Sequence, residues 1–192
     1  MKHFARTILA ALPLVLLPAA FAQHQTFTVS PNDSQVTFFL AGSDHGTHGT
    51  FHVQSGIVDF DRTLPKIAGS IVVSAASGDS GNKSRDHKMT TEVLDVAHFA
   101  DVTFAPQSYQ GTILASGDST IQVTGVFTLH GTPHTITVPM QIHIDGANCT
   151  AKAQFNVPYV KWGLKDPSIL FLKVAKEVDV NITLVGHLNP AS

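Results

Sequence analysis

Apolar and polar residues alternate with a period of two along most of this chain, and no other feature constrains the fold as strongly. Between residues 121 and 129, most apolar side chains have one parity and most polar side chains have the other. Because successive side chains of a strand point to opposite faces, the pattern predicts a strand with one buried face. Residues 136–144 repeat the pattern after a Gly131-Thr132-Pro133 turn signal, so the two segments are expected to form a hairpin.

Further segments also have the composition of strands, and most follow one another without a helix that could make a parallel crossover. Roughly eight to ten antiparallel strands at this spacing predict an all-β sandwich or barrel. A transmembrane barrel is disfavoured because the aromatic residues are scattered phenylalanines with a single tryptophan, Trp162, instead of two girdles. The further strand-like segments are residues 26–30, 36–40, 49–60, 67–75, 102–109, 151–157 and 178–184.

The first 22 residues have the pattern of a cleavable signal peptide. Lys2 and Arg6 flank an apolar run over residues 8–17, and Ala20-Phe21-Ala22 supplies the small residues of a cleavage site. The run is shorter than a membrane span. Residues 23–192 are therefore expected to form one mature domain, soluble and exported.

Charge and cysteine content limit the partners of this expected mature domain. It carries 10 basic and 14 acidic residues, because Lys2 and Arg6 belong to the signal peptide, so its net charge is −4 with histidine neutral. That balance disfavours nucleic acid and anionic membrane surfaces as electrostatic partners. Cys149 is the only cysteine, so the domain has no internal disulfide and depends on its core.

Residues 78–104 interrupt the alternation. Ser80 or Asn82 can cap a helix, and Met89 and Val93 then lie on one helical face at a spacing of four. The polar run over residues 85–88 would follow the exposed side of that helix. One or two short helices are therefore expected near residues 80–100, covering one end or flank of the sheet.

The same block contains an ordered set of motifs, and further motifs flank it on both sides. Within the block these are Gly81-Asn82-Lys83, Arg85-Asp86, Met89, Leu94-Asp95-Val96, Phe99 and Thr103-Phe104, and the flanking ones are Val36-Thr37-Phe38, Gly49-Thr50-Phe51, residues 126–131, Pro139 and residues 178–184. Over essentially the whole mature chain, this set resembles the YceI-like family of exported lipid-binding proteins. The resemblance implies an extended, lipocalin-like antiparallel β-barrel that sequesters or carries an isoprenoid lipid of quinone or polyprenyl type, usually in the periplasm. Such a protein needs no cofactor, and both a monomer and a homodimer remain open.

Nine apolar residues on the expected inward faces are candidates to line the lipid site. For any one of them an ordinary core position is the alternative, and only their number favours a cavity. Four further residues at the expected mouth could orient a head group, the alternatives being helix capping, a local ion pair and a hydrophobic plug. The lining candidates are Phe38, Leu40, Phe51, Phe104, Phe127, Leu129, Met140, Ile142 and Phe155, and the mouth candidates are Asn82, Arg85, Asp86 and Trp162.

A serine hydrolase is a weak alternative. Gly78-Asp79-Ser80-Gly81 copies part of the loop around the nucleophile of chymotrypsin-like proteases. However, Asn82 stands where that motif has glycine, and a G-x-S-x-G elbow is absent from the sequence. We therefore expect no catalytic residue in this chain, and interpret the segment as the entry to a helix.

A metal-binding or stress-related interaction protein on the same scaffold is the stronger alternative. His45, His48 and His52 are closely spaced, and His130 and His134 flank the expected turn. Zinc or copper needs three or four such ligands converging on one point, which spacing alone does not provide. No metal site is therefore expected.

Overall fold

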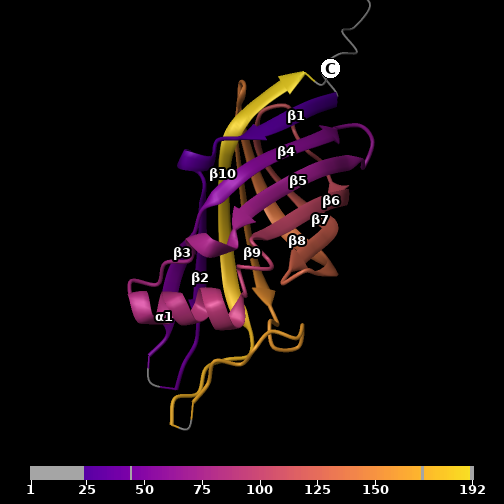
Figure 1. Ribbon diagram of the computed structural model, residues 1–192. Coiled ribbons are helices and arrows are strands. Elements are labelled where there is room, and N and C mark those ends of the chain that lie inside the picture. Colours follow the sequence, from indigo (N-terminus) through magenta and orange to yellow (C-terminus); the bar gives the residue numbers. More distant parts are fainter. Residues whose placement is uncertain (1–23, 44, 170, 191–192) are drawn as a thin grey trace, which may run out of the picture.

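The protein is described here by a computed structural model that covers residues 24–43, 45–169 and 171–190; the expected signal peptide lies outside them. These residues form ten strands and a short helical insertion (Figure 1). The strands are β1 (His24–Val29), β2 (Gln35–Leu40), β3 (Thr47–Phe51), β4 (Val53–Asp61), β5 (Ile67–Ser74), β6 (Asp101–Gly111), β7 (Gly117–Leu129), β8 (Thr132–Asp145), β9 (Asn148–Val157) and β10 (Val178–Pro190).

Eight strands close into an antiparallel barrel in the order β1-β4-β5-β6-β7-β8-β9-β10, because β10 also pairs with β1. β10 is long enough to serve two partners along one edge: residues 186–190 pair with β1, and residues 179–183 pair with β2. The β2–β3 hairpin therefore extends the sheet beyond the closed part of the barrel (Figure 1). The expected all-β, lipocalin-like antiparallel barrel is confirmed.

Two local expectations differ from the structure. Residues 49–60 form two strands with a break at His52. There the N–H donates to the Ser77 hydroxyl, beyond the end of β5, while the C=O accepts the N–H of Ser74, the last residue of β5. The β7–β8 turn is also tighter than the sequence signal suggested. It consists of His130 and Gly131, both with positive φ (51° and 70°), as two-residue hairpins of this hand require.

The alternating side chains build two apolar clusters inside the barrel. We call them the upper and lower clusters after the places in Figure 1 of the elements that carry them. Phe104 packs against both. The upper cluster consists of Phe27, Val29, Val36, Val53, Val58, Phe60, Ile71, Tyr109, Ile113, Ile121, Val123, Ile142, Ile144, Cys149, Ala151, Leu184 and Leu188. The lower cluster has Phe127, Leu129, Val157, Tyr159 and Leu164 at its centre, surrounded by half-buried side chains.

The insertion between β5 and β6 contains a 3₁₀ turn (Ala75–Ser77), the helix α1 (Lys83–Lys88) and a π-helical turn (Met89–Val93). The side-chain oxygen of Asn82 caps α1 by accepting the N–H groups of Ser84 and Arg85, both at 3.1 Å. Val93 packs against the lower cluster. The expected short helices are thus confirmed, and they cover the lower flank of the sheet (Figure 1).

Within the described ranges, no helix is both long enough and apolar enough to cross a bilayer.

Candidate functional site: an apolar cavity

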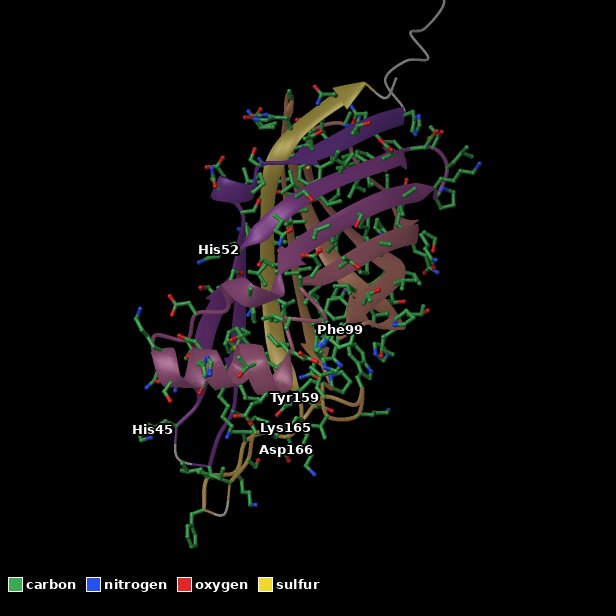
Figure 2. The ribbon with its side chains drawn as sticks, in the orientation of Figure 1. His45, His52, Phe99, Tyr159, Lys165 and Asp166 are labelled. Carbon is green, nitrogen blue, oxygen red and sulfur yellow. The ribbon has the colours of Figure 1, made fainter. Side chains whose placement is uncertain are left out.

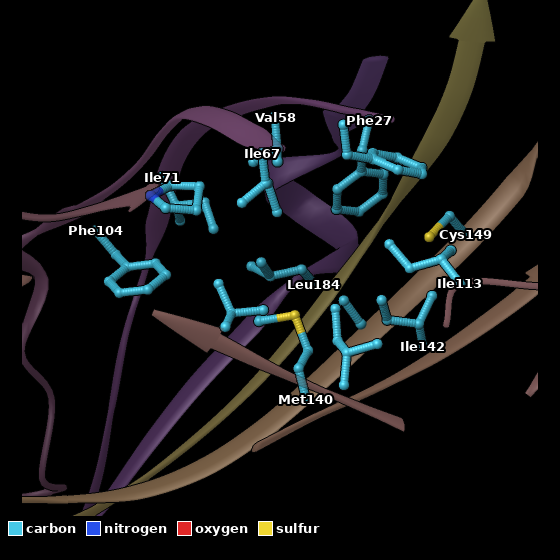
Figure 3. A pocket seen from close by; sticks show the side chains of 15 residues that line it. Phe27, Val58, Ile67, Ile71, Phe104, Ile113, Met140, Ile142, Cys149 and Leu184 are labelled. Atoms are coloured by element: carbon cyan, nitrogen blue, oxygen red, sulfur yellow. The ribbon is translucent and has the colours of Figure 1, made fainter. Parts of the chain in front are cut away.

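A cavity of about 50 Å³ lies inside the barrel, within the upper cluster (Figure 3). All eight barrel strands contribute to its wall, and no charged side chain does. An apolar cavity of this kind offers a water molecule no hydrogen-bond partner and is suited to hydrocarbon. The wall consists of Phe27, Val58, Phe60, Ile67, Ile71, Phe104, Pro106, Ile113, Ile121, Val123, Met140, Ile142, Cys149, Ala151 and Leu184.

The cavity is small for a ligand site. Ligand pockets commonly enclose about 300–1,000 Å³, whereas this cavity measures about 50 Å³ because neighbouring side chains fill the rest of the barrel. A long hydrocarbon chain would therefore have to displace side chains. Phe104 and Met140 are only half-buried at the cavity wall, so they can move more easily than the fully buried residues around them.

The nine predicted lining residues lie at different heights in the barrel. Phe104, Met140 and Ile142 line the cavity itself. Phe38 and Phe51 form a tilted ring pair with centroids 5.4 Å apart, at the strands β2 and β3. The structure places the remaining predicted lining residues in or against the lower cluster: Leu40, Phe127, Leu129 and Phe155.

Three of the four predicted mouth residues are engaged at the entry to α1. Arg85 donates from Nε to the Ser80 hydroxyl at 2.8 Å and from its guanidinium to the Ser80 carbonyl at 2.7 Å. Asp86 accepts both the Ser80 hydroxyl and the Ser80 N–H. These hydrogen bonds from Ser80 hold the pKa of Asp86 below its usual value. Asn82 caps the same helix, so these side chains fix the geometry of the helix entry.

This arrangement also bears on the hydrolase alternative. The Ser80 hydroxyl donates to a carboxylate and accepts from a guanidinium, and neither group is a general base of the kind that a triad uses. The Gly-Asp-Ser-Gly segment therefore begins a helix in this structure, as the sequence interpretation held.

Trp162, the fourth mouth candidate, belongs to an aromatic group at the lower end of the barrel. Its ring stacks on His134 with centroids 4.0 Å apart and planes 7° apart. It also lies 5.9 Å from the ring of Phe127, which in turn contacts Phe155 edge to face. In the part of the chain that the structure describes, Nε2 of His134 is buried and has no hydrogen-bond partner.

His134 is the polar residue of this region that the sequence interpretation did not assign to the lipid site. It shares the parity of Ile136, Val138 and Met140 on β8, so the signal was present in the alternation. In the sequence it stands out only together with His130, as a possible metal ligand. The structure gives the two histidines different partners, because His130 lies against Phe99 with ring centroids 4.3 Å apart.

The other closely spaced histidines are also separated. His48 lies over the ring of Phe39, with centroids 4.5 Å apart. Figure 2 shows His45 and His52 well apart on the β2–β3 side of the molecule. Among the residues described, no three His, Cys, Asp or Glu side chains come together as a metal ion would require.

The chain matches known proteins in sequence. A family model described as the YceI-like domain matches residues 27–186. A UPF0312 protein from Pseudomonas fluorescens (strain SBW25) is 31% identical over 149 residues, which is 72% of each chain. A UPF0312 protein from Pseudomonas savastanoi pv. phaseolicola (strain 1448A / Race 6) is 30% identical over 147 residues, again 72% of each chain.

Solved structures share the fold. Burkholderia cenocepacia BcnA aligns with a TM-score of 0.67 and 24% identity, covering 82% of this chain and 99% of that chain. A polyisoprenoid binding domain from Saccharophagus degradans aligns with a TM-score of 0.64 and 14% identity, covering 85% and 98%. Because the family model spans most of the chain, from residue 27 to residue 186, this protein belongs to the YceI-like domain family.

Proposed function

We propose that this protein binds the hydrocarbon chain of an isoprenoid lipid, of quinone or polyprenyl type, inside the barrel and carries it without chemistry of its own. The observation that carries this proposal is the cavity wall, to which all eight barrel strands contribute and no charged side chain does. The fold shared with a polyisoprenoid binding domain supports it. Export to the periplasm is part of the proposal: export rests on the signal-peptide pattern of residues 1–22, and the compartment on the membership in the YceI-like family.

Hydrocarbon burial supplies enough free energy for such binding. Each buried methylene contributes about 0.8 kcal/mol, so ten carbons contribute roughly 8 kcal/mol. That corresponds to about micromolar affinity before the cost of ordering the ligand is subtracted. No catalytic group or metal is needed to reach it.

The ligand chain would run from the cavity toward the lower cluster. Along β8, Met140 at the cavity and His134 at the lower end are six residues apart, about 20 Å at roughly 3.4 Å per residue. Phe104 contacts both clusters and separates the cavity from the region below it. Most apolar side chains of the lower cluster are only half-buried, so displacing them loses less packing than opening the upper cluster.

The lower end also offers a partner for a polar head group. A buried imidazole nitrogen without a hydrogen bond is unfavourable by about 1–3 kcal/mol. A carbonyl or hydroxyl oxygen at the end of an isoprenoid chain would satisfy Nε2 of His134. We place the head group there, against the stacked ring of Trp162.

The proposal is tested by extracting the purified protein with organic solvent and identifying the lipid by mass spectrometry. An isoprenoid lipid at near-equal stoichiometry supports the proposal, whereas a protein that yields none and takes up none in the titration below overturns it. Geranylgeraniol and a short-chain ubiquinone analogue are then titrated into delipidated protein. Trp162 is the only tryptophan of the chain, so its fluorescence reports the lower end of the barrel specifically.

Two variants make the titration site-specific. Ala151→Leu places extra carbons in the cavity and is expected to weaken binding roughly tenfold, because the ligand must compete with the new side chain. Ala147→Leu, in the exposed β8–β9 turn, is the matched control and should bind like the parent protein. His134→Leu is expected to weaken the ubiquinone analogue more than a plain hydrocarbon of equal length. Equal binding by the Ala151 variant and the control would contradict the assignment of the cavity.

A further inference from the structure

The connection between β9 and β10 projects beyond α1, at the end of the molecule opposite the C-terminus (Figure 1). Its outermost residues are unusually apolar. Phe171 is 91% exposed, and Ile169 and Leu172 are 54% and 51% exposed. We call these three residues the apolar tip. Of the six large apolar side chains that are exposed in the described part of the chain, three therefore lie within four residues of one another.

The tip is held in place by hydrogen bonds. The N–H of Ile169 donates to the carbonyl of Leu172 at 3.0 Å, and the reverse bond measures 3.1 Å. On the side toward the barrel, the N–H of Val174 donates to the Ser168 hydroxyl at 3.1 Å. The segment that leads into β10 also pairs with the end of β2, since the N–H of Ala175 donates to the carbonyl of Ala41 at 2.8 Å. The backbone that carries the apolar side chains is therefore fixed by hydrogen bonds.

The segment that forms this projection contains more lysines than acids. Residues 161–177 contain four lysines and two acids, although the expected mature domain as a whole carries 10 basic and 14 acidic residues. Lys161, Lys173 and Lys176 are exposed. Lys165, labelled in Figure 2, forms an ion pair with Glu92, and the Lys165 Nζ lies 2.5 Å from the Glu92 carboxylate. Asp166 lies near two of these lysines: its pKa is lowered chiefly by hydrogen bonds from Ser168 and also by the positive charges of Lys176 and Lys173. With Glu92 counted, the four lysines face three acids, so the segment keeps an excess of one positive charge, against the overall sign of the domain.

We propose that the apolar tip docks this protein on an anionic phospholipid bilayer, inserting into the interface while Lys161, Lys173 and Lys176 lie against the head-group phosphates. A convex tip fits a deformable bilayer, which accepts apolar side chains to a depth of about 5–10 Å. Lysine stems can follow apolar surface while their ammonium groups stay at the level of the phosphates. The docking is peripheral and reversible, because three side chains do not anchor a domain whose net charge is negative.

This inference does not depend on lipid carriage in the barrel, because the tip lies outside the cavity wall. It would bring the lower end of the barrel, where the aromatic group lies, close to the membrane surface. The overall net charge argued against an anionic surface at the level of composition. At one end of the molecule the local charge is slightly positive, so that expectation does not apply there.

The test is flotation of the protein with vesicles of phosphatidylcholine alone or with 30% phosphatidylglycerol. The parent protein should float with the anionic vesicles, and more weakly with the neutral ones. A tip variant, Ile169→Ser/Phe171→Ser/Leu172→Ser, should lose roughly tenfold or more in partitioning. The matched control, Ile57→Ser/Leu64→Ser/Leu114→Ser, removes the three other exposed apolar side chains and should partition like the parent protein.

Charge is tested separately. Lys173→Gln/Lys176→Gln should reduce binding to anionic vesicles and its dependence on salt, whereas Lys66→Gln/Lys152→Gln, which also removes two exposed lysines, should not. Failure of the parent protein to float, or unchanged flotation of the tip variant, overturns the inference. Sedimentation of the protein without vesicles is measured alongside. A dimer that only the tip variant loses would assign the tip to a second copy of the chain and likewise overturn it.

Discussion

Cys149 places a thiol among the apolar side chains that line the barrel cavity. Its side chain lines the cavity and is 5% exposed. Burial raises the pKa of this thiol from its ordinary value of 9.0 to about 11, against a weaker opposing effect from the positive charge of Arg62. The folded protein therefore keeps Cys149 neutral at physiological pH. Because it is the only cysteine, its chemistry can be followed without interference.

Cys149 should react slowly with iodoacetamide in the folded protein. At pH 8 the higher pKa reduces the thiolate about 100-fold relative to the unfolded chain, and burial slows the reaction further. The alkylation rate is measured by mass spectrometry, with urea-unfolded protein as the control. Bound lipid should slow the reaction again. Equal rates in the folded and unfolded protein would contradict the burial of this thiol.

The same shift predicts how stability depends on pH. Below pH 9 the thiol is protonated in both the folded and the unfolded state, so it adds no pH dependence. Between pH 9 and about 11 the unfolded state loses its proton first, so the free energy of unfolding falls as pH rises. Cys149→Ala should lessen that alkaline decline in denaturant titrations. Tyr159 adds to the decline between pH 10 and about 12, because burial raises its pKa from 10.0 to about 12.

At the scale of elements, two turns set the register of β7, β8 and β9. The β7–β8 turn contains Gly131 with φ of 70°, and the β8–β9 turn contains Gly146 with φ of 58°. A Cβ on Gly131 would lie 2.5 Å from the ring of Phe99, whereas a Cβ on Gly146 would meet nothing within 4 Å. Both turns require a left-handed backbone, but only the first is also packed against the helical insertion.

These two glycines make a matched pair of substitutions. Gly146→Ala should lower the free energy of unfolding by about 1 kcal/mol, because an L-residue in a left-handed backbone is strained. Gly131→Ala should lower it by roughly 2 kcal/mol or more, because the Phe99 ring must also move. Urea titration of both variants measures the difference. Equal losses would show that the contact between this turn and the insertion does not contribute to stability.

The elements that the sequence predicted best are those whose cause is local. Alternation predicted the strands, and Asn82, one of the two candidate caps with Ser80, marks the start of α1. The split at His52 was missed because both bonding partners of its backbone, Ser74 and Ser77, lie more than twenty residues further along the chain. No local pattern encodes a partner at that distance.

At the scale of the whole molecule, the barrel is packed unevenly. The upper cluster is mostly fully buried and is enclosed by paired strands on every side. The lower cluster is mostly half-buried and is covered by the helical insertion and the segment after β9. Among the described residues, β3 ends the sheet and pairs with β2 alone along its length, apart from a bridge between Thr50 and Asp79. The lower end is therefore expected to open first.

Hydrogen exchange followed by mass spectrometry should show this gradient. Amides of β9, which pairs with β8 and β10, should exchange at least roughly tenfold more slowly than those of β3. Added isoprenoid lipid should protect the lower cluster more than the upper one, because the lower part must open to admit a chain. Uniform exchange across the barrel would contradict an entry at the lower end.

The sequence by itself determined the strand class, the helical insertion, the family and the inward parity of the candidate lining residues. These follow from local geometry, since a strand alternates its faces whatever it pairs with. Only the tertiary structure decided that Phe104, Met140 and Ile142 line the cavity while Phe127, Leu129 and Phe155 lie below it. Height in the barrel depends on register, which hydrogen bonds between distant strands set. Contacts between distant parts of the chain also decide three other features. These are the closure of β10 on β1, the stacking of His134 on Trp162 and the projecting tip near Phe171.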